Sequence, residues 1–166
     1  TDIYSMSQGL PTKGMTTLRG LREEYAKRTV EGDIGMRYSI HGIVDAGGIE
    51  LVSELSGIHE DRCRELIEHL SVHTDEVPTN EEMERLDFAL ASIAIETAVK
   101  RHVGRLEEHY SPIGISYMQV GKDLTAVQNV IVTGGALIHT KRTAAIAAHA
   151  YYDPTDAFTL KPREAQ

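Results

Sequence analysis

The first thirty residues alternate loosely between apolar and polar positions, a pattern typical of β-strands with one polar face. It predicts strands over residues 2–7 and 25–30 and a short strand over residues 15–18. Two glycines and a proline within residues 8–14 predict a turn between the first strand and the short one. The opening segment is therefore expected to form a small antiparallel unit.

From residue 34 the apolar positions recur at helical spacing instead. We predict four helices: from Ile34, with Asp33 as N-cap, to the Gly47-Gly48 break; residues 49–55; residues 60–72; and from the N-cap Thr79 to about Tyr110. The expected buried stripe of the third helix consists of Cys63, Leu66, Ile67 and Leu70. The middle of the fourth helix, residues 88–99, is apolar nearly all round and should be buried between other elements.

A continuous run of β-forming residues at 127–132 is expected to be a strand buried on both faces, as in a parallel sheet. It ends at Thr133-Gly134-Gly135-Ala136, and a helical pattern resumes over residues 137–152. The order predicts an α/β fold with a largely helical insertion. Its regions are a strand-rich part (1–33), a helical part (34–112), a strand, Gly-Gly turn and helix (113–152), and a tail (153–166).

The length of 166 residues suggests one domain, and a hydrophobic content of 41% is ordinary for a globular protein. With 25 acidic against 17 basic residues, the net charge of −8 argues against nucleic acid and anionic membranes as partners. The single cysteine, Cys63, cannot form an internal disulfide, which favours a cytoplasmic location. Because Thr1 opens directly into a strand pattern without an initiator Met, we expect a piece of a longer chain.

Two glycine-containing corners, each between a predicted strand and a predicted helix, are candidate ligand sites. At Gly134-Gly135 and at Glu31-Gly32-Asp33, glycine would let a ligand approach the backbone closely, and the next helix would offer unpaired N–H groups. Either corner could equally be a connection without a ligand.

Eight histidines raise the question of a metal site. His69 and His73 are four residues apart on one predicted helix, and Glu65 precedes His69 by one turn. Since no further ligands follow at a suitable spacing, we expect solvated side chains and no structural metal there.

Several stretches together resemble a known protein family. Residues 25–39 (YAKRTVEGDIGMRYS) are similar to the signature of the MutL/GlmL proteins, and residues 121–125 and 130–138 match the same family. Residues 1–5 look like the tail of its second phosphate loop, cut after the first Thr. These proteins accompany adenosylcobalamin-dependent glutamate mutase and related aminomutases, and they are unrelated to the mismatch-repair protein of the same name.

The resemblance implies an actin/ribonuclease-H-like ATPase fold, in which two α/β lobes close over ATP and Mg²⁺. This chain would be the second lobe. By resemblance, Thr1 and Asp2 would be catalytic residues of the phosphate loop, Glu31, Gly32 and Asp33 would lie near the nucleotide sugar or base, and Thr133, Gly134, Gly135 and Ala136 would form the adenosine-binding turn.

The function implied by the resemblance is that of an ATP-dependent, chaperone-like factor that reactivates a cobalamin-dependent mutase. ATP or ADP and Mg²⁺ would be its cofactors, mutase subunits would be its partners, and cobalamin would be bound by the mutase. This chain alone is expected to lack ATPase activity, and homo-oligomerisation stays open. Two alternatives remain: a small-molecule kinase of the same superfamily, and an interaction domain that binds no nucleotide.

Overall fold

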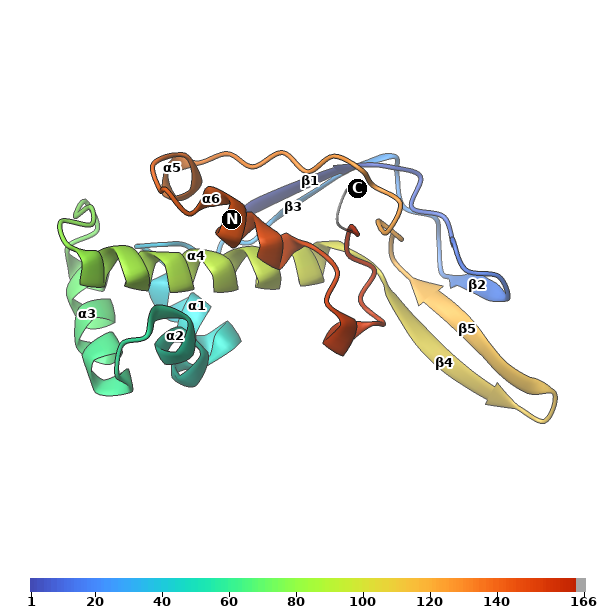
Figure 1. Ribbon diagram of the computed structural model, residues 1–166. Coiled ribbons are helices and arrows are strands. Elements are labelled where there is room, and N and C mark those ends of the chain that lie inside the picture. Colours follow the sequence, from blue (N-terminus) through green and yellow to red (C-terminus); the bar gives the residue numbers. More distant parts are fainter. Residues whose placement is uncertain (164–166) are drawn as a thin grey trace. The chain divides into compact units, whose positions relative to one another are not determined.

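The computed structural model describes residues 1–163, which form a mixed α/β fold (Figure 1). The chain divides into two compact units. We call them the helical unit (Thr1, Val30–Ala98 and Val132–His149) and the strand unit (Asp2–Thr29, Val99–Ile131 and the residues from Ala150 onward). Within the described residues, every helix is too short or too polar to cross a membrane.

The helical unit is built around four helices: α1 (Ile40–Gly47), α2 (Ile49–Ser56), α3 (Glu60–Val72) and α4 (Glu81–His102). The predicted stripe of α3 is confirmed, since all four of its residues are buried: Cys63, Leu66, Ile67 and Leu70. They share one hydrophobic core with Leu86 and Leu90 of α4. The middle of α4 is mostly buried, as its apolar sequence predicted.

The start of α1 differs from the prediction, because the helix begins at Ile40 rather than at Ile34. Residues 34–37 form no regular element, residues 38–39 form a turn, and the N-cap is Ser39 and not Asp33. The Asp33 carbonyl oxygen lies so close to Gly42 that a Cβ built there would be 1.8 Å from it. This close backbone contact holds the preceding segment beside α1 rather than in line with it, and hydrophobic periodicity cannot register such a contact.

Both ends of α4 also differ from the prediction. Asn80, not Thr79, caps the N-terminus, because the Asn80 side-chain oxygen accepts a hydrogen bond from the Met83 N–H at 2.9 Å. At the other end the helix stops at His102 instead of continuing to about Tyr110.

Among the residues that the structure describes, the strand unit contains five strands in two sheets (Figure 1). They are β1 (Asp2–Met6) paired with β3 (Ala26–Val30), and a three-stranded sheet in the order β2 (Thr16–Arg19), β5 (Gly114–Val120), β4 (Arg105–Ser111). The three strands predicted in the opening segment are confirmed within a residue or two. The predicted antiparallel grouping is wrong for β2, which runs parallel to β5 in the other sheet.

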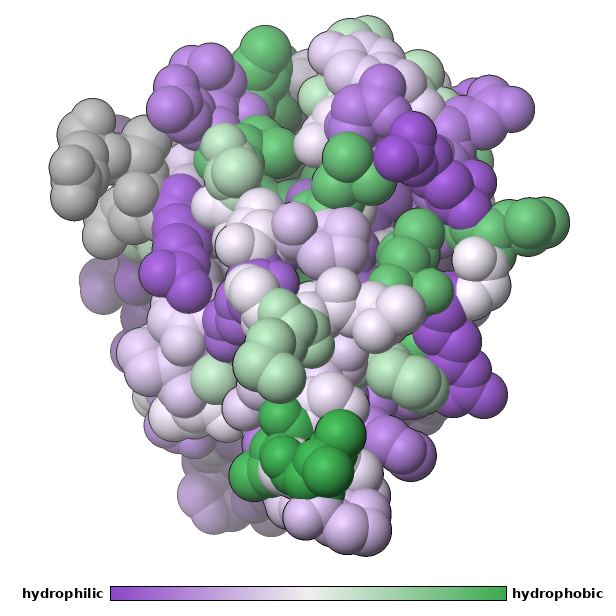
Figure 2. All heavy atoms as spheres, turned by 90° about the vertical axis from the view of Figure 1, so that its right-hand side faces the viewer, coloured by the Kyte–Doolittle hydropathy of each residue, from purple (hydrophilic) through white to green (hydrophobic). Residues whose placement is uncertain are grey.

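Residues 105–111, predicted to be helical, form β4, which pairs antiparallel with β5. The chain leaves the helix because Gly104 packs against the backbone at the end of β5, where an added Cβ would lie 2.6 Å from the Val120 carbonyl oxygen. The turn between β4 and β5 carries an exposed hydrophobic residue, Ile113, which is 98% exposed. Figure 2 views the molecule from the side of this hairpin and shows a cluster of strongly hydrophobic side chains on that face.

Residues 127–132 form no strand, so the predicted buried strand is wrong. A β-forming run needs neighbouring strands for its backbone hydrogen bonds, and the two sheets of the described chain are complete without this segment. The helix predicted over residues 137–152 is broken into α5 (Gly135–Ile138), α6 (Thr143–Ala147) and a short 3₁₀ turn (Ala148–Ala150).

The buried environment of Cys63 predicts an unreactive thiol. The side chain is fully buried, its Sγ donates to the Ile58 carbonyl at 3.4 Å, and burial raises the pKa of the thiol. A thiol-reactive dye should therefore label the native protein only after unfolding in guanidinium. Val72→Cys, which adds a thiol at an exposed position on the same helix, should be labelled at once in the native state. Rapid native labelling of Cys63 would contradict the packing described for α3.

Candidate functional site

Thr1, one of the predicted catalytic residues, lies beside the corner formed by Glu31, Gly32 and Asp33. Its hydroxyl donates to the Ile34 carbonyl at 3.0 Å, and its carbonyl accepts the Glu31 N–H at 2.8 Å. Gly32 and Asp33 are exposed. The structure thus brings together four residues that the resemblance assigned to two different parts of a nucleotide site.

Asp2, the other predicted catalytic residue, forms an ion pair with a residue of the neighbouring strand β3. Its carboxylate accepts a hydrogen bond from the Arg28 guanidinium at 2.5 Å, which raises the pKa of Arg28. The guanidinium carbon also lies 5.2 Å from the centroid of the Tyr4 ring. Asp2 is therefore paired with a cation supplied by β3.

The predicted adenosine turn is exposed at all four of its positions, Thr133, Gly134, Gly135 and Ala136. Gly134 has φ +103°, a conformation that residues with a side chain rarely adopt. A Cβ built at Gly134 meets no described atom within 4 Å, and one at Gly135 meets only the His139 ring, at 3.9 Å. The backbone of this turn is accessible, as close approach of a ligand requires.

Both corners are anchored to the same side of α4. Met36 follows the first corner and Leu137 follows the second, and both pack against a small cluster that contains Phe88 and Ala91 of α4. The Arg142 guanidinium lies 3.3 Å from the centroid of the Phe88 ring and adds a cation–π contact to this cluster. Two segments far apart in the sequence are thereby held at one stretch of helix.

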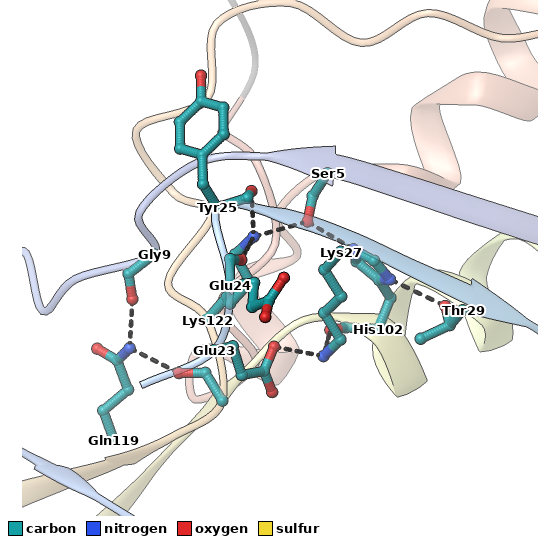
Figure 3. Close-up of polar contacts among 11 residues, drawn as sticks. Ser5, Gly9, Glu23, Glu24, Tyr25, Lys27, Thr29, His102, Gln119 and Lys122 are labelled. Atoms are coloured by element: carbon teal, nitrogen blue, oxygen red, sulfur yellow. Dashed lines mark hydrogen bonds and ion pairs between the residues drawn. The ribbon is translucent and has the colours of Figure 1, made fainter. Parts of the chain in front are cut away.

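The strand unit contains a buried polar cluster that the sequence did not predict (Figure 3). The Lys122 side chain is 1% exposed, and its ammonium donates to the carbonyls of Glu24 at 3.0 Å and Tyr25 at 2.9 Å and to the Ser5 hydroxyl at 3.2 Å. Burial lowers the pKa of Lys122. The lysine, which follows β5, thus ties that strand to β1 and to the residues before β3.

His102 continues this cluster at the C-terminal end of α4 (Figure 3). The ring is fully buried, with Nε2 2.8 Å from the Ser5 hydroxyl and Nδ1 2.9 Å from the Thr29 hydroxyl. Its backbone carbonyl accepts a hydrogen bond from Lys27 at 2.8 Å, and Lys27 also pairs with Glu23 at 2.8 Å. Ser5 lies between a lysine and a histidine, but it is only 9% exposed, so we assign the cluster to holding the strands in place.

The sequence offered one signal for this cluster, the family-like stretch at residues 121–125, but no role for its Lys122. The next residue, Asp123, is 4% exposed and accepts hydrogen bonds from the hydroxyls of Thr12 at 2.7 Å and Thr125 at 2.5 Å. Lys and Asp are usually exposed, and no periodic pattern surrounds them here. Their burial therefore could not be predicted from the chain alone.

Comparisons with known proteins agree with the motifs. The family described as "MutL protein" matches residues 1–166. The chain is 41% identical over 163 residues to "Protein MutL" of Clostridium tetanomorphum, an alignment that covers 98% of the chain and 35% of that relative. The chain thus spans about a third of the relative's length, and no solved structure matches it. The chain belongs to the MutL family, which confirms the resemblance.

Replacing Lys122 tests the structural role of the polar cluster. Lys122→Met keeps the aliphatic part of the side chain but removes the ammonium donor of the Glu24 carbonyl and leaves the Tyr25 carbonyl with only the Ser7 N–H. We expect a loss of about 2–4 kcal/mol in the free energy of unfolding, measured by urea denaturation. The exposed Lys13→Met is the matched control and should cost less than about 0.5 kcal/mol. Equal stability of the two variants would show that the buried ammonium is dispensable.

Proposed function

We propose that this chain is one part of an ATP-dependent accessory factor that reactivates an adenosylcobalamin-dependent glutamate mutase or a related aminomutase. Membership of the MutL family supports the association with such a mutase. In this proposal the chain is the second lobe of an actin/ribonuclease-H-like ATPase fold, with α1–α4 as the helical insertion. Cobalamin is bound by the mutase and not by this chain.

The observation that carries the nucleotide part of the proposal is the packing of Met36 and Leu137 on one cluster of α4. Each of these residues follows a corner that the family resemblance assigns to nucleotide binding. A site assembled from two distant corners needs such a common support, because binding groups must be held in place before the ligand arrives.

The residues of the corners fit a nucleotide. A Cβ built at Gly32 or at Gly134 meets no described atom within 4 Å, and one at Gly135 meets only the His139 ring, so two exposed backbone stretches are available to a flat base or a sugar. Thr133 and Ala136 flank the second stretch. Glu31 and Asp33 add carboxylates that suit hydroxyl groups of a ribose.

The phosphate part of the proposal involves Thr1 and Asp2. Once released from the Ile34 carbonyl, the Thr1 hydroxyl can donate to a phosphate oxygen, and a carboxylate can hold Mg²⁺ through its bound water. Asp2 would first have to leave Arg28. The free-energy cost of breaking this ion pair is small, because both side chains are exposed to solvent. ATP supplies the phosphoryl group, and its binding and hydrolysis would drive the change of shape that frees the mutase of damaged cofactor.

The direct test of the proposal is a reactivation assay with the full-length protein and an aminomutase that carries an inactivated cobalamin. Fresh adenosylcobalamin and ATP together should restore mutase activity, and ATP omitted or replaced by a non-hydrolysable analogue should not. Recovery at the same rate without any nucleotide would contradict the proposal.

Gly135→Val tests the adenosine turn without disturbing the fold. Gly135 has an ordinary φ and open space around it, whereas a Val at Gly134 would be strained by its φ of +103° whether or not a ligand binds. In the full-length protein, Gly135→Val should weaken ATP binding by at least ~2 kcal/mol in a calorimetric titration and leave the melting temperature nearly unchanged. Gly14→Val, another position with open space, is the control that should retain full affinity.

Unchanged ATP affinity in Gly135→Val would make this turn a connection that binds no ligand. A lower melting temperature with unchanged affinity per folded molecule would have the same meaning.

This chain by itself should not hydrolyse ATP. Phosphoryl transfer requires charge stabilisation and positioning from both sides of the γ-phosphate, and under the proposal this chain supplies only Thr1 and Asp2 from the phosphate loops. Release of inorganic phosphate should not exceed that of a protein-free blank. Steady turnover by the 166-residue chain, abolished by Asp2→Asn, would show that the catalytic site is complete here.

A further inference from the structure

Two imidazoles and a carboxylate converge where α3 ends in the helical unit. His69 and His73 stack with their ring centroids 4.2 Å apart, and the Glu76 carboxylate lies 2.6 Å from the Nε2 atom of His69. One potential ligand atom of each residue lies within 4.8 Å of those of the other two. From the sequence we expected no metal here, because only Glu65 lay near the two histidines. The structure instead supplies Glu76, from the loop before α4, as a third potential ligand, and we revise that expectation on this ground.

The hydrogen bonding of His73 prepares the ring to bind a cation. Its Nδ1 atom lies 2.9 Å from the His69 carbonyl oxygen. Because a carbonyl only accepts hydrogen bonds, Nδ1 carries the proton, and the neutral ring keeps its lone pair on Nε2. Histidines that bind metals generally donate their other ring N–H in this way.

The loop that carries Glu76 is also fixed in place. The Glu76 N–H donates to the His73 carbonyl at 3.1 Å, and the Glu76 carbonyl accepts a hydrogen bond from Arg37 at 3.2 Å. Arg37 in turn forms two hydrogen bonds to the Asp87 carboxylate, at 2.9 and 2.8 Å. The third ligand therefore approaches the helix from an anchored turn.

We propose that His69, His73 and Glu76 form an open binding site for one zinc-type divalent ion, with water completing the coordination. Imidazole and carboxylate together suit Zn²⁺ and its first-row neighbours. Bonds of about 2.0–2.2 Å to a tetrahedral ion place the ligand atoms roughly 3.3 Å apart, so the stacked rings of His69 and His73 must turn until both lone pairs point at the ion. The ion replaces the proton between His69 and Glu76 and fastens the loop to α3. The proposal is independent of the nucleotide site.

Calorimetric titration of the tag-free protein with zinc chloride at neutral pH tests the site. We expect one ion per chain, and a loss of affinity of about tenfold or more in His73→Ala and in Glu76→Gln. His109→Ala is the matched control, since His109 is exposed on β4 and should leave the affinity unchanged. Circular dichroism of each variant checks that the helices are retained.

Thermal melts provide a second measurement that does not depend on the heat of binding. Zinc should raise the melting temperature of the wild type and of His109→Ala, but not of the double variant His69→Ala/His73→Ala, because only a folded site gains from the ion. The proposal is overturned by the absence of saturable binding below millimolar zinc. Equal affinity of the wild type and His73→Ala, or an equal loss in His109→Ala, overturns it as well.

Discussion

The burial of α4 is the constraint on which the rest of the helical unit depends. The middle of this helix is apolar on nearly every side, so it must be covered from more than one direction. The main core, with Leu86 and Leu90, packs against α1, α2 and α3, while Phe88 points to a second cluster that Met36 and Leu137 complete. Loss of a large buried side chain costs about 2–5 kcal/mol. Met36 and Leu137 are therefore held against the second cluster, and each fixes the glycine corner that precedes it.

The sequence predicted those parts of the fold that depend on neighbouring residues. α2 and α3 follow from their apolar spacing, and Gly57 ends α2 with a positive φ of 66°, a local property of glycine. The predicted start of α1 and the predicted end of α4 are wrong, because backbone contacts with segments outside each helix determine where the helix begins and ends. Asp33 lies against Gly42, and Gly104 lies against the chain after β5. Neither contact leaves a trace in the periodicity of the residues involved.

The candidate site shows the same division. The glycine pattern and the family motifs both predict the two glycine corners as candidate ligand sites, since a short stretch of sequence carries each of them. They could not explain Lys122, because its ammonium binds backbone carbonyls of Glu24 and Tyr25, and every residue type offers such a carbonyl. At residues 127–132 the sequence predicts a strand that the structure lacks. The composition favours a strand, but a strand also needs neighbouring strands to pair with, and composition carries no information about them.

Different interactions stabilise the two units. This difference determines where a substitution can test binding without also changing stability. The strand unit depends on buried donors such as Lys122 and His102, so changes there alter stability first. In the helical unit the proposed nucleotide residues occupy exposed turns, and the contacts at Thr1 are made with backbone atoms of Glu31 and Ile34. A Cβ added at Gly32 would therefore meet no described atom within 4 Å. Substitutions at the exposed corners should therefore alter the protein's surface while the burial of α4 holds the position of the corners.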